Sequence, residues 1–543
     1  MTDLITAPAR RSAVLDDAHL GDIKGAFGTI KQGDTAARSG LSSKFKTLLA
    51  VVGPGLIVMC GDNDAGAFST YGQSGQNYGT SLLWVLLLLV PVLYVNQEMV
   101  VRLGVVTGVG HGKLILERFG RFWGIFSVID LFLLNALTLV TEFIGITLAV
   151  GYLGLPKAPS ILAAAVVVIG AASTGSFRRF ERVALTLCFG SLILIPIALA
   201  LHPSGGQLAS GFLVPSLPGG AAQLSTVMLL IIGLVGTTVA PWQLFFQQSY
   251  VIDKRITPRF MKYEKADLWI GIAVVVVGAG AIIGFAAAAT AGTPAAGHFT
   301  DAAGLASAIA AKSGHLLGIL FAVALLDASI IGAFAVSLST AYAIGDTFGV
   351  NHSLHRGVKQ AKGFYGVYVA LIAVAAGIVL IPNAPLGLIT NGVQAMAGVL
   401  LPSASVYLLL LCNDKEVLGP WVNGRRTNIF TSCVLGVLVT LSVVLTASVI
   451  WPAITADQIG AIMLAFLALG VVLGGSVLTR RGPKPAPIDR TGAEDWRMPP
   501  LSELGQTRLS AGKRIAMGSL RSYLVISSLL VVVKVVELSI AGH

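Results

Sequence analysis

The sequence predicts an all-α polytopic membrane protein with about twelve transmembrane helices. Of its 543 residues, 55% are hydrophobic and only 12% are charged, and the mean hydropathy is +0.81, so the chain lacks the polar residues that a water-facing surface of this size requires. The apolar residues gather in blocks of roughly 18 to 25, which is the length that spans a bilayer core of about 30 Å. Backbone groups in lipid must be hydrogen-bonded within the segment itself, so blocks of this length indicate helices.

Twelve apolar blocks are expected to cross the membrane, as two successive sets of five followed by two more. They lie at residues 46–76, 80–101, 122–152, 159–174, 183–202, 223–250, 268–290, 315–345, 364–382, 386–411, 428–450 and 456–478. The transmembrane domain therefore covers 46–478, between a flexible cytoplasmic tail at 1–45 without a signal-peptide core and a cytoplasmic tail at 479–543. An apolar segment at 520–540 in the second tail is either a thirteenth span or a helix lying at the interface.

The net charge of +11 comes mainly from alternate loops. These loops contain Arg102, Lys113, Arg118 and Arg121; Arg178, Arg179 and Arg182; Lys254, Arg255, Arg259, Lys262 and Lys265; Arg356, Lys359 and Lys362; Lys415, Arg425 and Arg426; and Arg480, Arg481 and Lys484. Because positive loops stay in the cytoplasm, this alternation predicts a bacterial-type inner-membrane protein with both ends of the twelve-helix core cytoplasmic. It also accounts for the basic composition without a nucleic-acid partner.

Two of the blocks are expected to break in the middle of the membrane. The first contains Asp62, Asn63 and Asp64 between glycines, although each charge at the centre of a span costs about 2.5–3.5 kcal/mol. The sixth contains the segment Gly236–Pro241, where proline removes a backbone hydrogen bond. The two breaks occupy corresponding positions in the two sets of five, which is typical of an inverted repeat with an ion site at the bilayer midplane.

The residues around these breaks resemble the NRAMP family of divalent metal transporters. The similarity is carried by residues 53–67, 79–84, 102–108, 142–145, 233–241 and 394–402. The resemblance implies a LeuT-like fold, a 5+5 inverted repeat in which helices 1 and 6 are broken. It further implies that Asp64 is the principal metal ligand and that Gln394 lies near the metal.

The chain departs from the family's motifs at several positions. Ala65 and Ala67 stand where the first-helix motif has proline and a ligating asparagine, and Ala240 stands where the sixth helix has a methionine ligand. Trp242 replaces the family's histidine, and Leu139 replaces an aspartate one turn before Glu142. Loss of the soft thioether leaves only oxygen ligands, which suit hard ions, and this pattern resembles the NRAMP-related magnesium transporter branch.

The candidate metal site follows from these alignments. Its residues either supply a side-chain or backbone oxygen or are small and widen the cavity: Asp62, Asn63, Asp64, Ala65, Thr237, Ala240 and Gln394. The candidate pathway residues are polar or aligned with the family's relay: Glu142, Trp242, Gln247 and Asp327. Whether Asp62 contacts the ion stays open. Mg²⁺ keeps several waters on one or two carboxylates, so we expect uptake of Mg²⁺ and/or Mn²⁺ by alternating access.

Proton relays in membranes are chains of Asp, Glu and His, and two relay positions are apolar here, so we expect transport that is not strictly proton-coupled. Two alternatives remain, a proton-coupled Mn²⁺/Fe²⁺ symporter and a cation-coupled organic solute transporter of the same fold. The sequence contains no nucleophile–base pair, phosphate loop or cofactor motif, so we expect no enzyme activity and no cofactor beyond the transported cation. The oligomeric state is left open, with a monomer plausible.

Overall fold

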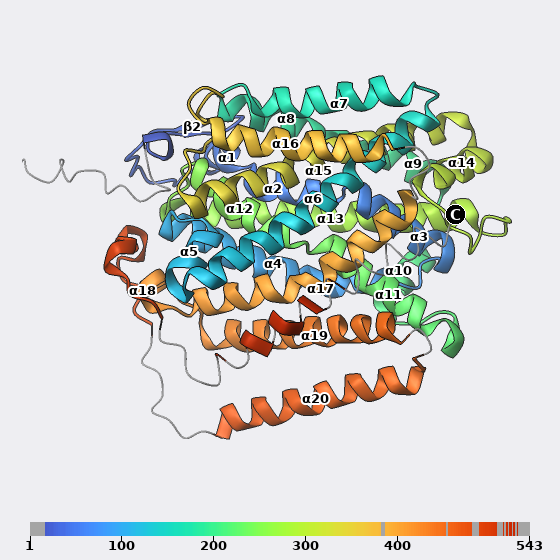
Figure 1. Ribbon diagram of the computed structural model, residues 1–543. Coiled ribbons are helices and arrows are strands. Elements are labelled where there is room, and N and C mark those ends of the chain that lie inside the picture. Colours follow the sequence, from blue (N-terminus) through green and yellow to red (C-terminus); the bar gives the residue numbers. More distant parts are fainter. Residues whose placement is uncertain are drawn as a thin grey trace, which may run out of the picture.

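A computed structural model describes residues 17–381, 386–451, 454–479, 488–507 and a few isolated residues between 514 and 529. The long helices run roughly along one axis and form a single bundle (Figure 1). The first set comprises α1 (Leu41–Val51), α2 (Pro54–Asp62), α3 (Ala65–Tyr78), α4 (Leu83–Thr107), α6 (Arg121–Tyr152), α7 (Lys157–Ala172), α8 (Phe177–Gly190) and α9 (Leu194–Leu201). The second comprises α11 (Gly220–Thr238), α12 (Pro241–Asp253), α13 (Met261–Thr290), α15 (His315–Phe348), α16 (Lys362–Val379) and α17 (Leu386–Cys412), and the last two spans are α19 (Arg425–Ile450) and α20 (Ala456–Thr479).

Each of the twelve predicted blocks corresponds to one, two or three helices in the described part of the chain. Nine are long and apolar enough by themselves to cross a membrane. The other three are the broken first block, the 16-residue α7 and α20, whose apolar part spans 457–472. Short helices that the sequence analysis did not anticipate connect them: α5 (His111–Phe119), α10 (Gly205–Leu213), α14 (Ala302–Ser313) and α18 (Lys415–Leu418).

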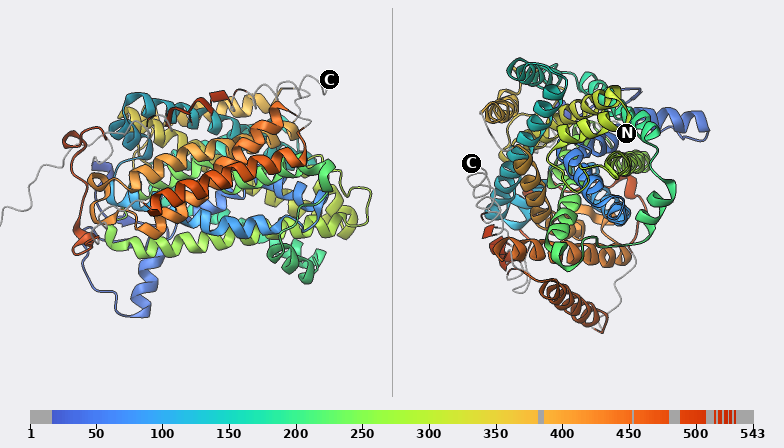
Figure 2. Two further views of the ribbon diagram at one scale, coloured as in Figure 1. Left: turned by 90° about the horizontal axis from the view of Figure 1, so that it is seen from below. Right: turned by 90° about the vertical axis from the view of Figure 1, so that its right-hand side faces the viewer.

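The first block is bent near its start, which the sequence did not predict. Within the span expected from residue 46, α1 ends at Val51 and α2 starts at Pro54, with the two axes bent by 54°. Gly53 has a φ of 151°, a value that glycine alone adopts readily, and Pro54 occupies the first turn of α2, where its missing N–H costs nothing. The helix α1 therefore projects from the side of the bundle (Figure 2).

The two sets of five pack with exchanged partners. The broken first span, α2 and α3, lies against α13, the second span of the other set. The broken sixth span, α11 and α12, lies against α4, the second span of its partner set, and the third spans α6 and α15 pack along each other. An exchange of this kind is what a two-fold relationship between the sets produces.

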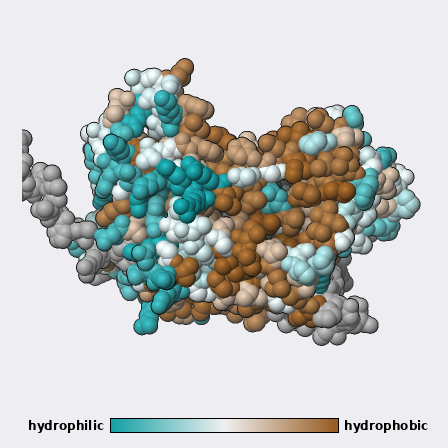
Figure 3. Space-filling model, turned by 90° about the horizontal axis from the view of Figure 1, so that it is seen from above, coloured by the Kyte–Doolittle hydropathy of each residue, from teal (hydrophilic) through white to brown (hydrophobic). Residues whose placement is uncertain are grey.

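The basic loops gather at one end of the bundle, where β2 (Thr29–Ile30), α5, α12 and α18 also lie (Figure 1). Neighbouring segments are joined by hydrogen bonds there. Arg118 Nε donates to Asp414, and Arg255 donates to the Ala18 carbonyl. This end has a hydrophilic surface, whereas a broad hydrophobic region covers the middle of the molecule (Figure 3). The basic loops that the sequence predicted to lie on one side of the membrane are therefore found together at one end of the bundle.

The segment 17–40, which we expected to be part of a flexible tail, packs on this basic end. A short hairpin of β1 (Ile23–Lys24) and β2 presents Ala26, whose N–H donates to Glu181 Oε2 of α8. Arg178 of α8 donates to the Gly25 carbonyl, and Ala50 lies so close to Gly25 and Gly28 that no side chain fits there. The hairpin is thereby fixed beside the start of the first broken span.

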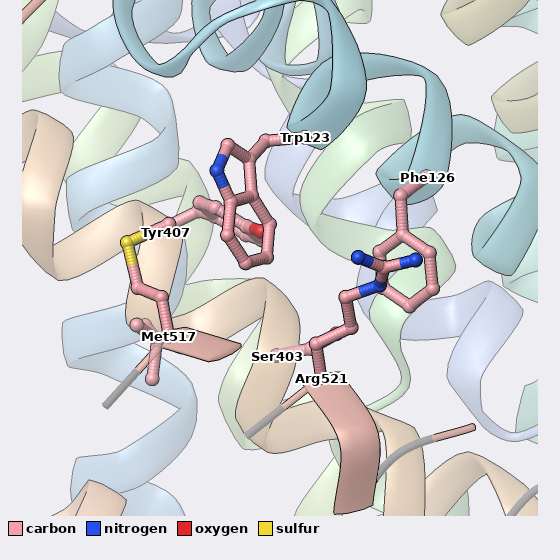
Figure 4. A pocket seen from close by; sticks show the side chains of 7 residues that line it. Trp123, Phe126, Ser403, Tyr407, Met517 and Arg521 are labelled. Carbon is pink, nitrogen blue, oxygen red and sulfur yellow. The ribbon is translucent and has the colours of Figure 1, made fainter. Parts of the chain in front are cut away.

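The described part of the C-terminal tail also returns to the basic end. Trp421 Nε1 donates to the Ala493 carbonyl, and Thr507 N–H donates to the Arg118 carbonyl. Farther along, the Arg521 guanidinium lies 3.8 Å from the centre of the Phe122 ring and reaches a small pocket beside Trp123 and Phe126 (Figure 4). Of the apolar segment at 520–540, only residues 521–523, 525, 526 and 529 are described, and the Tyr523 hydroxyl lies 2.8 Å from Ser442 Oγ of α19.

Candidate functional site

The first break separates α2 from α3 by two residues. Asp62 ends α2, Asn63 follows it, and Asp64 is the N-cap of α3, where its Oδ1 accepts the Ala67 N–H at 2.8 Å. Aspartate is among the best N-caps because its carboxylate satisfies one of the free N–H groups of the first turn. The Ala65 N–H is bound instead by Glu142 Oε2 of α6, at 3.2 Å.

The start of α2 is held by charged residues that the sequence analysis did not select. Asp267 of α13 accepts the N–H groups of Gly53 at 3.1 Å and Gly55 at 2.7 Å, so it caps the helix. Lys254 binds the carbonyls of the bend at Val51 and Val52 and forms a fully buried ion pair of 2.6 Å with Glu181. The only sequence signal for these residues is that Asp267 and Glu181 border apolar blocks.

The second break lies within the predicted segment. The helix α11 ends at Thr238, and α12 begins at Pro241 with Ala240 as its extended N-cap. Two residues into α12, the side-chain amide of Gln243 donates to Oδ1 of Asp62. The two breaks are thus directly joined by a hydrogen bond, and Gln243 is a site residue that no sequence motif indicated.

Gln394 of α17 reaches the same place. A Cβ built on Gly66 would overlap the Gln394 amide and would lie 3.2 Å from Asp64 Oδ1, so both side chains lie against one glycine. The backbone of Gln394 also lies close enough to Gly236 of α11 to exclude a side chain there. Small residues at these positions let α3, α11 and α17 approach one another at the breaks.

Glu142 and Trp242 both lie beside the first break. A Cβ on Gly332 would lie 2.6 Å from Glu142 Oε2 and 3.0 Å from Asp64 Cβ, which places the two carboxylates side by side. The Trp242 ring lies 3.3 Å from the position of a Cβ on Gly61. This buried tryptophan fills the space beside α2 and contributes no metal-binding atom.

Several buried polar atoms at the breaks have no hydrogen-bond partner within the described part of the chain: Asp62 Oδ2, Asn63 Oδ1, Glu142 Oε1, Thr237 Oγ1 and Gln394 Nε2. Their residues are at most 4% exposed. Buried polar groups are nearly always paired, because leaving one unpaired costs about 1–3 kcal/mol. Such a concentration of unpaired buried oxygen and nitrogen atoms marks a polar site at the two breaks.

Of the other two pathway candidates, Asp327 lies apart from the breaks and Gln247 has no assigned role. Asp327 of α15 faces Gly190 at the end of α8, so it is not among the residues gathered at the breaks. Gln247 is one turn beyond Gln243 on α12 and fully buried, and neither amide atom has a partner among the described residues. No cluster of three His, Cys, Asp or Glu suited to a metal occurs in the described residues.

Comparison with known proteins matches residues 55–448 to the family described as natural resistance-associated macrophage protein-like. The divalent metal cation transporter MntH of Ralstonia nicotianae is 27% identical over 73% of this chain and 90% of its own length. The protein of the same name from Staphylococcus aureus is 25% identical over 74% of this chain and 92% of its own.

Among solved structures, a manganese transporter of Eremococcus coleocola bound to an aromatic bis-isothiourea substituted compound has the same fold. It superposes with a TM-score of 0.61 at 18% identity and covers 84% of this chain and 97% of its own. The fold is therefore that of the NRAMP transporters, with the LeuT-like arrangement that the resemblance implied. The chain belongs to the natural resistance-associated macrophage protein-like (NRAMP) family, whose members are multi-pass membrane transporters and not enzymes.

Proposed function

We propose that this protein transports divalent metal cations, Mg²⁺ and/or Mn²⁺, by alternating access, with Asp64 as the principal ligand and without strict proton coupling. The observation that carries the proposal is the group of unpaired buried oxygens at the two breaks, on Asp62, Asn63 and Thr237, next to the Asp64 carboxylate. A divalent cation would satisfy these atoms and compensate the buried carboxylates, which is the usual way in which such groups are tolerated.

The choice of ion rests on the chemistry of these ligands. The N-cap of α12, where the resemblance places a methionine thioether, is Ala240, so this position supplies no sulfur ligand. Carboxylate and carbonyl oxygens suit Mg²⁺ and Mn²⁺, whereas thioethers select softer ions. The amide of Gln394 beside Gly66 supplies a further oxygen if its side chain is turned.

The burial of the proposed site determines how the ion can reach it. Because its residues are buried, the ion enters and leaves only when the half-helices α2 and α12 move relative to the bundle. We place the basic end of the molecule in the cytoplasm on the strength of the charged loops. An inside-negative potential then favours import of a divalent ion by about 4.6 kcal/mol per 100 mV, twice the value for one charge.

The test is flux of Mg²⁺ and Mn²⁺ into proteoliposomes that contain wild-type protein or Asp64→Ala, with lumenal pH recorded in parallel. We expect both ions to enter, no acidification, and loss of flux in the variant. Asp327→Ala is the matched control because that aspartate faces Gly190; it is expected to keep its flux. Absence of any metal flux would instead favour the organic solute transporter.

One observation favours the second candidate, a proton-coupled Mn²⁺/Fe²⁺ symporter. Glu142 lies beside Asp64 and keeps one carboxylate oxygen without a partner among the described residues, which is the position a proton acceptor needs. Flux of Mn²⁺ alone that acidifies the vesicle lumen would establish this candidate in place of the first.

A further inference from the structure

An open cavity of about 260 Å³ lies at the basic end of the bundle, and none of its lining residues belongs to the two breaks. Its walls are the end of α4, the start of α13, the loop between α18 and α19, and the C-terminal tail. The charged residues that line it are Glu98 and Arg102 of α4, Lys265 of α13 and Arg490 of the tail.

The cavity has an excess of positive charge. Arg102 Nη2 lies 3.0 Å from Glu98 Oε2, and Lys265 Nζ lies 2.9 Å from Glu98 Oε1. Three cations thus face one carboxylate, which leaves two positive charges (three minus one) uncompensated by the lining. An anionic group would find its countercharge here.

The deepest of these cations still has a free donor. The guanidinium of Arg102 binds Asn423 Oδ1 at 2.6 Å and the Trp421 carbonyl, which fixes its plane. Its Nε is buried without a hydrogen-bond partner among the described residues, although Arg102 is only 6% exposed. Arg102 also lines the cavity, and a guanidinium held in a fixed plane matches the oxygens of a phosphate.

Aromatic residues place the cavity at the level of lipid headgroups. Tyr94 and Trp421 line it, and the Tyr94 ring stacks at 4.6 Å on Trp269, which is 47% exposed on the outside of the bundle. Tyrosine and tryptophan collect where the membrane meets water. The cavity therefore opens where the phosphates of one leaflet lie.

We propose that this cavity binds a phosphate group, as carried by the headgroup of an anionic phospholipid or by free phosphate. Arg102, Lys265 and Arg490 hold the phosphate, and Trp421 packs beside it. Basic pockets between transmembrane helices are suited to such headgroups. Arg490 lies beyond residue 448, where the match to the family ends, so the tail of this chain completes the site.

The test uses full-length protein in neutral detergent, with bound lipid counted by native mass spectrometry. Phosphatidylglycerol is compared with phosphatidylcholine, for wild type and for the Lys265→Gln/Arg490→Gln double variant. Arg426→Gln is the matched control because Arg426 is exposed at the same end on α19 but does not line the cavity. If the double variant fails to fold, Arg490→Gln alone, in the exposed tail, replaces it.

We expect wild type and the control to retain phosphatidylglycerol, and the double variant to bind it about thirtyfold more weakly, because each basic residue contributes about 1 kcal/mol. Inorganic phosphate separates the two sources: failure to displace the lipid assigns the site to the headgroup. Displacement, together with stabilisation by phosphate alone that the double variant lacks, assigns it to free phosphate. Equal phosphatidylglycerol binding in wild type and double variant, or an equal loss in Arg426→Gln, would overturn the proposal.

Discussion

Gln243 donates its side-chain amide to Asp62 Oδ1 and so connects the second broken span to the first. The same glutamine accepts a hydrogen bond of 3.0 Å from Gln97 of α4, so the aspartate at the end of α2 is tied to α12 and to the helix on which α12 packs. When α2 or α12 moves, either this hydrogen bond breaks or the other half-helix moves with it. The carboxylate of Asp62 is positioned by residues far from it in sequence.

Removing the Gln243 amide is expected to weaken the closed state. In Gln243→Ala, Asp62 loses its donor, and a hydrogen bond to a charged group contributes about 1.5–3 kcal/mol. We expect a lower melting temperature in detergent and reduced metal flux. Gln247→Ala is the matched control, because Gln247 is equally buried one turn away but its amide has no partner in the described chain. Equal destabilisation by both variants would contradict the role of the Asp62 contact.

Substitutions of Glu142 separate a positioning role from proton transfer. Its Oε2 accepts the Ala65 N–H at the first break, and an amide oxygen can replace it there. We expect Glu142→Gln to keep metal flux, and Glu142→Leu to lose it because a buried N–H is left unpaired, at a cost of about 1–3 kcal/mol. Flux measurements at two values of lumenal pH check this. Inactivity of both variants would favour proton coupling instead.

Gly53 is expected to tolerate no side chain. Its φ of 151° is a value that glycine adopts readily and other residues rarely adopt. A Cβ there would overlap the Glu181 carboxylate and lie 2.9 Å from Lys254 Nζ. Backbone strain alone costs about 1–3 kcal/mol, so Gly53→Ala is expected to lower the melting temperature strongly.

Gly170→Ala in α7 provides the comparison, because no atom of the described chain lies within 4 Å of a Cβ at that helical position. Replacing glycine by alanine inside a helix stabilises by about 0.5–1 kcal/mol. A melting temperature of Gly53→Ala equal to that of wild type would show that the bend between α1 and α2 is not rigid.

The raised pKa of His352, in the loop after α15, predicts that the stability of the folded protein depends on pH. Burial lowers the pKa of His352, but the Asp346 carboxylate, 2.9 Å from its Nε2, outweighs burial and raises the pKa from 6.5 to about 9. Because the folded protein then holds the proton more tightly than the unfolded chain, this stabilisation is complete below pH 6.5 and is lost as the pH rises through about 9.

Melting temperatures between pH 6 and pH 10 test this expectation. The wild-type value should fall over the upper half of that range, and His352→Gln should show a smaller fall because glutamine does not titrate. The same pH profile in both proteins would assign the loss of stability to other groups.

The sequence by itself determined the spans and the two breaks. Long apolar blocks, mid-membrane carboxylates and Pro241 act through local chemistry, so their positions needed no knowledge of the partners. The alternation of basic loops likewise predicted which loops share an end of the bundle, because each span reverses the chain. The bend at Gly53 within the first span was not predicted, since it depends on Lys254 and Asp267 from other helices.

The tertiary structure decided which polar residues meet. Gln243 binds Asp62 across 181 positions, and Asp267 caps α2 across 212. Composition and periodicity describe a residue's own segment, whereas a hydrogen-bond partner is chosen by how segments pack. For the same reason, only the folded chain placed the hairpin at 23–30 beside α8, moved Asp327 away from the breaks and brought Arg490 to Arg102 and Lys265.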